Sequence, residues 1–307
     1  MNGITEPKAL LVGLTAASLH QHWTVEESLL ELAELAKTAQ LQVCKRVVQN
    51  RQHPHPAHYV GTGKLEALAE IIKDLEITIL LVDDDLSPSQ HKTLEKRLNI
   101  KVMDRTGLIL DIFAQRAQTA EAKLQVELAQ LRYLLPRLTN LWTHLSRQSG
   151  GIGTRGPGET QLEVDKRQIN DRIEFIKKKL KKVSLNRAVQ TKNRKDKNTA
   201  VLAGYTNSGK STLINRLTQA DVLSEDKLFA TLDPTTRKLQ LPNHDAILIT
   251  DTVGFIQKLP HHLVQAFHAT LEGIAEADYI LHTVDVSSPK AIEMIETSQE
   301  IFKTLNA

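Results

Sequence analysis

The 307-residue sequence predicts an α/β protein in three parts: an N-terminal α/β domain, a long antiparallel helical hairpin, and a partial α/β domain with a doubly wound sheet. Short apolar runs alternate with helical patterns at the start of the chain, and a leucine seam at helical spacing follows them. A new strand, loop and helix then open near Thr199. We place the domains at 1–105, 106–183 and 199–307, with a basic linker at 184–198.

The N-terminal domain is predicted from strands separated by crossover helices. Strands are expected at 9–14, 41–48, 77–82 and 100–103, and helices at 24–39, 64–75 and 88–98. Thr24 and Glu27 have the spacing of a capping box, which places the start of the first helix. The segment Gly61–Lys64 opens the second helix, where it either holds an anion such as phosphate or RNA or serves as a turn and helix cap.

The helical hairpin is predicted from two apolar seams. The first seam consists of Leu124, Leu128, Leu131, Leu134, Leu135 and Leu138, and Pro136 is expected to kink the end of this helix. The second helix, at about 159–183, carries Leu162, Ile169, Ile173, Ile176 and Leu180 on one side. The glycine-rich loop 150–158 forms the tip. It spells GxGxxG, but it follows a helix rather than a strand, which argues against a dinucleotide site.

Positive charge is concentrated in one segment of the chain. The net charge is +3, yet residues 147–197 hold 15 Lys or Arg against 6 Asp or Glu, so this segment carries +9 and the remainder −6. Such a segment is typical of a nucleic-acid partner. The alternative for the lysines at 177–182 is a solvated helix face.

The composition argues against secretion and membrane insertion. Cys44 is the only cysteine, which excludes an internal disulfide and suits a reducing compartment. The apolar run 9–14 is too short for a signal peptide, and no apolar stretch approaches the roughly 20 residues of a membrane span. We expect a cytoplasmic monomer.

The strongest motif is GxxxxGK[ST], placed between a predicted strand and a predicted helix. Its glycines let backbone N–H groups point inward, and the helix adds its positive N-terminal end, so that the loop binds phosphates. Lys210 is expected to hold the β and γ phosphates, and the Ser211 hydroxyl to ligate Mg²⁺. The predicted nucleotide-binding residues are Gly204, Tyr205, Thr206, Asn207, Ser208, Gly209, Lys210, Ser211 and Thr212.

Two later segments agree with a GTP site. A buried-strand run ends in the DxxG sequence Asp251, Thr252, Val253 and Gly254. Its carboxylate is expected in the magnesium shell, and its glycine N–H at the γ phosphate. The loop Phe229, Ala230, Thr231, Leu232 and Asp233 occupies the position of a first switch, where a threonine completes magnesium coordination. We choose Thr231, with Thr235 and Thr236 as alternatives, so Ser211, Thr231 and Asp251 form the predicted metal set.

The catalytic set is predicted as Lys210, Thr231, Asn207 and Gly254. Phe255 follows Gly254, where Ras-type enzymes place a water-orienting glutamine, so slow unaided hydrolysis is expected. In related GTPases an asparagine at the position of Asn207 accompanies activation by K⁺, which neutralises transition-state charge. The alternative is hydrogen bonding within the loop.

These motifs, together with the loop 149–163 and the segment 59–64, resemble the HflX family of ribosome-associated GTPases. The resemblance covers both N-terminal parts and the front half of a Ras-like P-loop G domain. It implies binding of GTP and GDP and of the large ribosomal subunit and its RNA. It also implies separation of stalled ribosomes under stress, with Arg147 and Arg155 at the hairpin tip contacting phosphates.

The sequence ends at Ala307, before the NKxD motif with which such GTPases read guanine. We expect the chain as written to bind GTP weakly and to expose apolar surface. A second hypothesis is therefore a ribosome- or RNA-binding module with an impaired G domain. A third, an ATP-using P-loop enzyme, is disfavoured by DxxG and the switch-like threonine loop.

Overall fold

The computed structural model describes residues 6–15, 23–141, 161–192, 198–218, 227–242, 245–259 and 273–305. The chain divides into two compact units, Met1–Ile112 with Gln130–Ile173 and Phe113–Ala129 with Glu174–Ala307. The predicted hairpin tip, including Arg147 and Arg155, lies outside the described residues.

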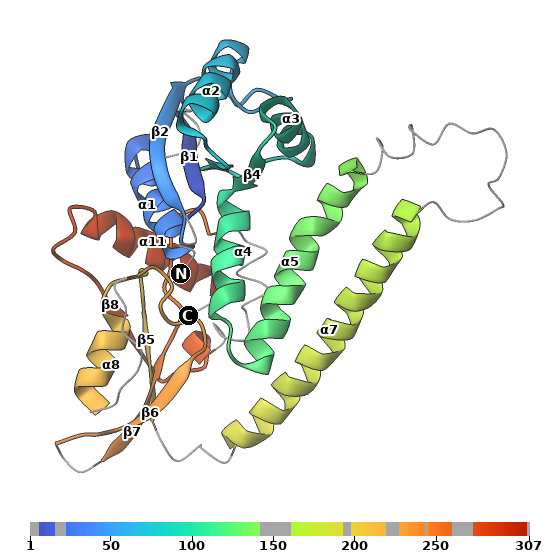
Figure 1. Ribbon diagram of the computed structural model, residues 1–307. Coiled ribbons are helices and arrows are strands. Elements are labelled where there is room, and N and C mark those ends of the chain that lie inside the picture. Colours follow the sequence, from blue (N-terminus) through green and yellow to red (C-terminus); the bar gives the residue numbers. More distant parts are fainter. Residues whose placement is uncertain are drawn as a thin grey trace, which may run out of the picture. The chain divides into compact units, whose positions relative to one another are not determined.

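A four-stranded parallel sheet forms the centre of the first unit, in the order β2-β1-β3-β4 (Figure 1). Parallel neighbours need crossover connections, which three helices supply. The strands are β1 (Lys8–Thr15), β2 (Gln42–Asn50), β3 (Ile79–Val82) and β4 (Lys101–Asp104), and the helices are α1 (Val25–Thr38), α2 (Thr62–Leu75) and α3 (Pro88–Leu98). The predicted α/β domain is confirmed, with strand and helix ends displaced by a few residues.

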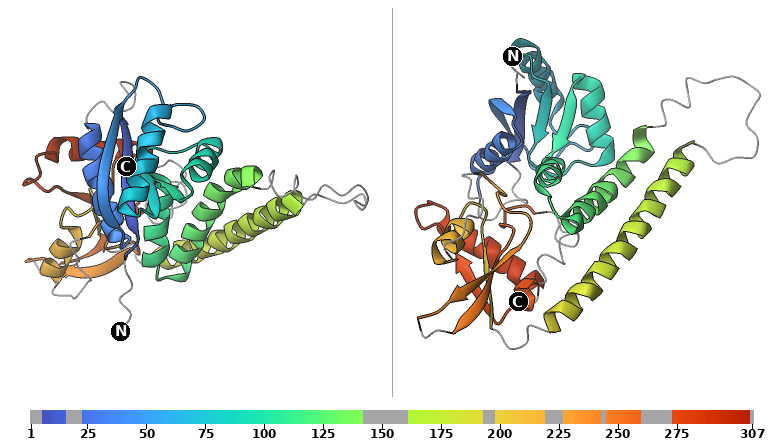
Figure 2. Two further views of the ribbon diagram at one scale, coloured as in Figure 1. Left: turned by 45° about the horizontal axis from the view of Figure 1, so that its top comes forward. Right: turned by 60° about the horizontal axis from the view of Figure 1, so that its bottom comes forward.

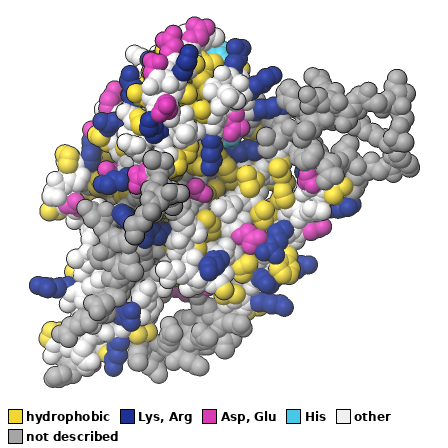
Figure 3. Space-filling model, viewed as in Figure 1, with side chains coloured by type: hydrophobic (Ala, Val, Ile, Leu, Met, Phe, Trp, Pro, Cys, Tyr) yellow, Lys and Arg dark blue, Asp and Glu magenta, His cyan; other side chains and the backbone are white. Residues whose placement is uncertain are grey.

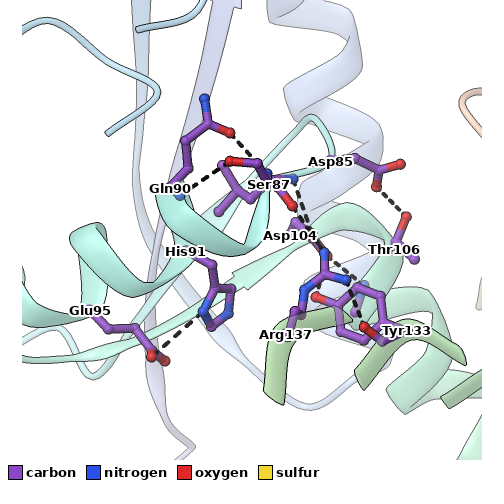
Figure 4. A network of polar contacts seen from close by, with 11 residues as sticks. Asp85, Ser87, Gln90, His91, Glu95, Asp104, Thr106, Tyr133 and Arg137 are labelled. Carbon is purple, nitrogen blue, oxygen red and sulfur yellow. Dashed lines mark hydrogen bonds and ion pairs between the residues drawn. The ribbon is translucent and has the colours of Figure 1, made fainter. Parts of the chain in front are cut away.

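The helix starts in this unit follow from their capping residues. The Thr24 side chain accepts a hydrogen bond from the Glu27 backbone and Glu27 returns one, so the predicted capping box is confirmed. Ser87 and Gln90 form the same arrangement at the start of α3 (Figure 4). Gly61 is the N-cap of α2, and its amide donates to the Gln49 side chain at 2.8 Å. The cap interpretation of Gly61–Lys64 therefore accounts for this turn.

Asp104, at the end of β4, holds the second half of α5 (Ala120–Leu141) within the first unit (Figure 4). Its Oδ1 accepts from the Tyr133 hydroxyl at 2.7 Å, and its Oδ2 accepts from Arg137 at 2.8 Å. The Arg137 guanidinium also lies over the Tyr133 ring, 3.5 Å from its centroid. Because the Asp104 carboxylate is fully buried, these partners offset the cost of removing it from water.

The helical region differs from the prediction in two ways. It contains α4 (Arg105–Arg116), α5 and α7 (Gln161–Lys192). Pro136, which is expected to kink the end of its helix, lies inside α5. A break between Arg116 and Ala120 separates α4 from α5, where the prediction had one helix. Helix α7 continues past the predicted end at Val183 because the following residues, as far as Lys192, include neither glycine nor proline.

The second unit contains a mixed sheet in the order β6-β7-β5-β8, and its orange strands are seen in the right view of Figure 2. Only β6 is antiparallel to its neighbour. Its elements are β5 (Thr199–Gly204), α8 (Lys210–Thr218), β6 (Thr235–Gln240), β7 (Ala246–Asp251), β8 (Tyr279–Thr283) and α11 (Ala291–Leu305). The predicted partial doubly wound fold is confirmed.

One strand of this sheet differs from expectation. Strand β6 was not predicted, because its side chains are exposed or half-buried and lack apolar alternation. Strand β8 lies at the edge of the sheet, where Tyr279 is 56% and Leu281 is 40% exposed. Across the described residues, no helix combines the length and apolar character needed to cross a bilayer.

Candidate nucleotide-binding site

The loop between β5 and α8 curls tightly at Gly204. This residue has φ +151°, and a Cβ there would lie 2.3 Å from the Thr283 carbonyl oxygen, so no side chain fits. Asn207 also has positive φ, at +58°. Left-handed residues in a turn before a helix direct N–H groups inward, which creates a concave anion site.

Lys210 begins α8 and is buried, with its ammonium directed back at the loop. Its Nζ donates to the carbonyl oxygens of Gly204 at 3.1 Å and Tyr205 at 2.6 Å. Burial lowers the pKa of Lys210 to about 8, while the charge of Asp251 acts in the opposite direction. The Lys210 ammonium is therefore already held at the loop, where it could bind a phosphate group.

Ser211, Thr231 and Asp251 come together from three separate segments. The Ser211 hydroxyl donates to Asp251 Oδ2 at 2.6 Å and lies 2.8 Å from the Thr231 hydroxyl. Asp251 Oδ1 is buried and has no hydrogen-bond partner among the described residues. Burial raises the pKa of Asp251, and the Ser211 hydrogen bond opposes this shift. Two hydroxyls and a carboxylate with a spare oxygen suit a hard divalent cation such as Mg²⁺.

The alternative threonines lie elsewhere. Thr235 and Thr236 belong to β6, and the Thr236 hydroxyl lies 2.9 Å from that of Thr250 on the neighbouring strand. Of the three candidates, Thr231 is the one whose hydroxyl contacts Ser211.

A polar pocket joins the loop to the first switch segment. It is lined by Thr206, Asn207, Gly209, Lys210, Ser211, Thr212, Lys227, Phe229, Ala230, Thr231, Thr252 and Gly254. The prediction missed Lys227. Its positive charge, a short distance before the switch segment in the sequence, is the one feature that could have indicated a phosphate contact. No motif spacing distinguishes it from other residues of this loop.

The remaining predicted residues shape the site or lie beside it. Two of them belong to the phosphate loop: the Ser208 hydroxyl is 2.9 Å from the Thr283 hydroxyl, and the Tyr205 hydroxyl accepts from the Gln257 amide at 2.9 Å. Leu232 and Val253 are buried.

The hydrogen bonds of Asp233 reach neither the phosphate loop nor the metal set. Its carboxylate accepts from the backbone amides of Gln118 at 2.9 Å and Thr119 at 3.2 Å, residues that belong to the same compact unit.

Thr206 connects the phosphate loop to both switch segments. Its hydroxyl accepts from the Phe229 amide at 2.9 Å, and its own amide donates to the Phe255 carbonyl at 2.6 Å. A Cβ on Gly254 would lie 2.5 Å from Thr206 Cα, so this close approach requires glycine. The Phe255 side chain is fully buried and packs edge-to-face on Phe302, at 5.5 Å. Phe255 therefore offers no polar group to a catalytic water.

The lysine cluster at 177–182 of α7 is exposed. Lys177, Lys178, Lys179, Lys181 and Lys182 all face solvent, and dark-blue side chains lie over this helix in Figure 3. Lys177 pairs with Glu174 at 2.6 Å.

The fold and the site together define a P-loop GTP-binding protein with two switch segments. GTPase HflX of Escherichia coli K12 is 46% identical over 300 residues, covering 96% of this chain and 70% of the relative. The chain belongs to the HflX family of GTPases.

Other comparisons agree with this family. GTPase HflX of Lacrimispora saccharolytica is 55% identical, covering 90% of this chain and 66% of the relative, and that of Flavobacterium psychrophilum is 47% identical, covering 96% and 71%. The chain thus spans about two thirds of the length of these relatives.

Family models and a solved structure extend the match along the chain. The models are described as GTP-binding GTPase N-terminal, residues 26–114, GTP-binding GTPase Middle Region, residues 116–194, and 50S ribosome-binding GTPase, residues 199–306. A GTP-binding protein from Sulfolobus solfataricus in complex with GDP matches with a TM-score of 0.51 and 25% identity, covering 98% of this chain and 78% of that one.

Proposed function

We propose that this chain binds and hydrolyses GTP with Mg²⁺ and uses the nucleotide state to control its binding to the large ribosomal subunit. The observation that carries the proposal is the meeting of Ser211, Thr231 and Asp251 beside the buried Lys210. A phosphate loop, a metal cluster and a switch threonine are the parts that nucleotide-dependent switching requires.

The proposed roles follow from the contacts. Ser211, Thr231 and Asp251 would hold Mg²⁺, which supplies charge neutralisation at the β and γ phosphates. Lys210 would exchange its two carbonyl contacts for phosphate oxygens, and loop amides would donate to the same phosphates. Gly254 would present its amide to the γ phosphate, a role supported by its close approach to Thr206.

The attacking water needs a group other than Phe255, whose ring is buried. A backbone group, another side chain or a bound partner has to orient it, so slow unaided hydrolysis is expected. We also propose K⁺ activation through Asn207, which lines the pocket with its backbone turned to positive φ. Equal hydrolysis rates in K⁺ and Na⁺ would remove the K⁺ proposal.

Ribosomal RNA is the proposed macromolecular partner. One matching family model is described as a 50S ribosome-binding GTPase, and the exposed lysines of α7 suit phosphate contacts. Under this proposal the protein separates or rescues stalled ribosomes under stress. It acts as a monomer in the cytoplasm, where its partner is found.

Nucleotide titration with GTP, GDP and ATP, with and without ribosomes, tests the proposal. GTP turnover stimulated by ribosomes is the expected result. ATP preference, or absence of any nucleotide binding, would contradict it.

A second candidate is a ribosome- or RNA-binding module with an impaired G domain, which the burial of Phe255 favours. The same titration separates the two. Salt-sensitive ribosome binding without turnover, in K⁺ as well as in Na⁺, supports the module.

A further inference from the structure

The segment from Phe229 to Asp233 is attached at both ends to a part of the chain that precedes the phosphate loop. At its far end, Asp233 accepts hydrogen bonds from the Gln118 and Thr119 amides and from the Thr119 hydroxyl. The Thr119 hydroxyl also accepts from the Ala122 amide at 3.1 Å, which makes Thr119 the N-cap of α5. A single carboxylate therefore joins the switch segment to the start of a helix.

At the near end, the Phe229 ring packs edge-to-face on Phe113, with centroids 4.8 Å apart, and both side chains are buried. The Phe229 amide donates to Thr206 of the phosphate loop. All of these residues belong to the second compact unit. The switch segment is thus held by the phosphate loop on one side and by residues 113–119 on the other.

Thr231 lies between these two attachments. Its hydroxyl is 2.8 Å from Ser211, and Asp233 follows it by two residues. A loop that is free before nucleotide binding loses conformational freedom when it closes on the ligand, and this entropy loss weakens binding. A loop that is already held by the hydrogen bonds of Asp233 loses less conformational entropy when the nucleotide binds.

We propose that Thr119 and Asp233 are positioning residues for GTP binding, which hold the first switch segment so that Thr231 stays beside Ser211. This inference rests on the function proposed above. Switch segments are ordered by contacts with the γ phosphate and Mg²⁺, so a contact that holds this segment in place favours nucleotides that carry a γ phosphate over GDP. By thermodynamic linkage, a γ phosphate in turn strengthens the contact between Asp233 and the start of α5.

Titrations of the full chain with fluorescent GDP and a fluorescent non-hydrolysable GTP analogue, both with Mg²⁺, test the inference. Asp233→Asn removes the carboxylate but leaves Thr119 as the cap of α5, and Thr119→Val removes the hydroxyl. Each is expected to weaken the GTP analogue about tenfold, the effect of losing a charge-assisted hydrogen bond, and to leave GDP within about twofold. Thr119→Ser retains the hydroxyl and should behave as wild type.

Thr304→Val is the matched control, because the Thr304 hydroxyl is bonded to the Glu300 carbonyl within its own helix. It should change neither affinity. In the wild-type chain, amide hydrogen exchange at Gln118 and Thr119 should be slower with the GTP analogue than with GDP.

Equal weakening of both nucleotides by Asp233→Asn, or no weakening of either, would overturn the inference, as would identical exchange at Gln118 and Thr119 in the two nucleotide states. In these outcomes wild-type binding still stands, so the proposed function survives. A wild-type chain that binds neither nucleotide would overturn both.

Discussion

Ser211 donates a hydrogen bond to Asp251 at 2.6 Å, joining two residues that lie 40 positions apart in the sequence. This contact brings the start of α8 to the end of β7. It also leaves Asp251 Oδ1 buried without a hydrogen-bond partner among the described residues. An unsatisfied buried carboxylate oxygen is costly, so a bound cation there would stabilise the site.

Ser211→Ala should remove the part of GTP binding that depends on Mg²⁺. The hydroxyl is lost as a ligand, and Asp251 loses its donor as well. We expect affinity for GTP in Mg²⁺ to fall at least about tenfold, while affinity in EDTA changes little. Ser211→Thr keeps the hydroxyl and should retain Mg²⁺-dependent binding. An equal loss in Mg²⁺ and in EDTA would argue against a metal-binding role.

Gly254→Ala should displace the second switch segment from the phosphate loop, because the new Cβ would lie 2.5 Å from Thr206 Cα. Backbone cannot yield as a flexible side chain can. We expect binding of a non-hydrolysable GTP analogue to weaken about tenfold or more, with a smaller effect on GDP, measured by titration calorimetry.

Gly63→Ala is the control for this variant. A Cβ at Gly63 meets nothing within 4 Å, and the residue lies within α2. It should leave nucleotide affinity unchanged and raise stability by about 0.5–1 kcal/mol. If Gly254→Ala bound the GTP analogue as tightly as Gly63→Ala, the close approach to Thr206 would have no functional meaning.

The parts of the site that sequence reasoning identified are local. The phosphate loop is contiguous, and DxxG closes a recognisable strand, so each could be assigned from neighbouring residues. The contact of Asp233 with Thr119 could not, because it joins residues 114 positions apart and depends on how the elements pack. Lys227 could not be assigned to the pocket from the sequence either, because it belongs to no motif with a defined spacing.

The fold shows the same division. The β1–β4 domain followed from alternating apolar runs and crossover helices, and the α1 cap followed from a motif of two residues. Strand β6 was not predicted because its ladder with β7 is formed by the backbone, and Leu239 is the one apolar side chain in it, so the sequence shows no apolar alternation. The break between α4 and α5 coincides with the cap at Thr119, and residues 117–119 include neither glycine nor proline that would mark it in the sequence.

Arg105→Met should destabilise the first unit. Arg105 is 1% exposed and forms ion pairs with Asp83 at 2.8 Å and with Glu31. Burial opposes its charge, but the two carboxylates hold the pKa of Arg105 above its ordinary value. Removing the cation leaves the buried Asp83 and the half-buried Glu31 without their partner, which should lower the free energy of unfolding by about 3–5 kcal/mol, measured by urea unfolding followed by circular dichroism.

Lys8→Met provides the comparison, because the pair of Lys8 with Glu76 is exposed and should contribute less than about 1 kcal/mol. A loss of similar size in both variants would mean that burial does not distinguish these ion pairs.

Replacement of Lys178 and Lys182 by glutamine should weaken ribosome binding if α7 contacts RNA phosphates. Both side chains are exposed, and glutamine keeps the helix intact while removing two positive charges. Each lost phosphate contact reduces the slope of log affinity against log salt concentration by about 0.7–0.9, so the double variant should show a slope lower by up to about 2. Sedimentation with large subunits over a range of salt concentrations measures this slope.

Replacement of Lys238 and Lys303 by glutamine is the control, because this exposed pair lowers the net charge equally but lies on β6 and α11. Were both pairs to change the slope alike, the attraction would belong to the charge of the whole protein, and α7 would be only a solvated helix face.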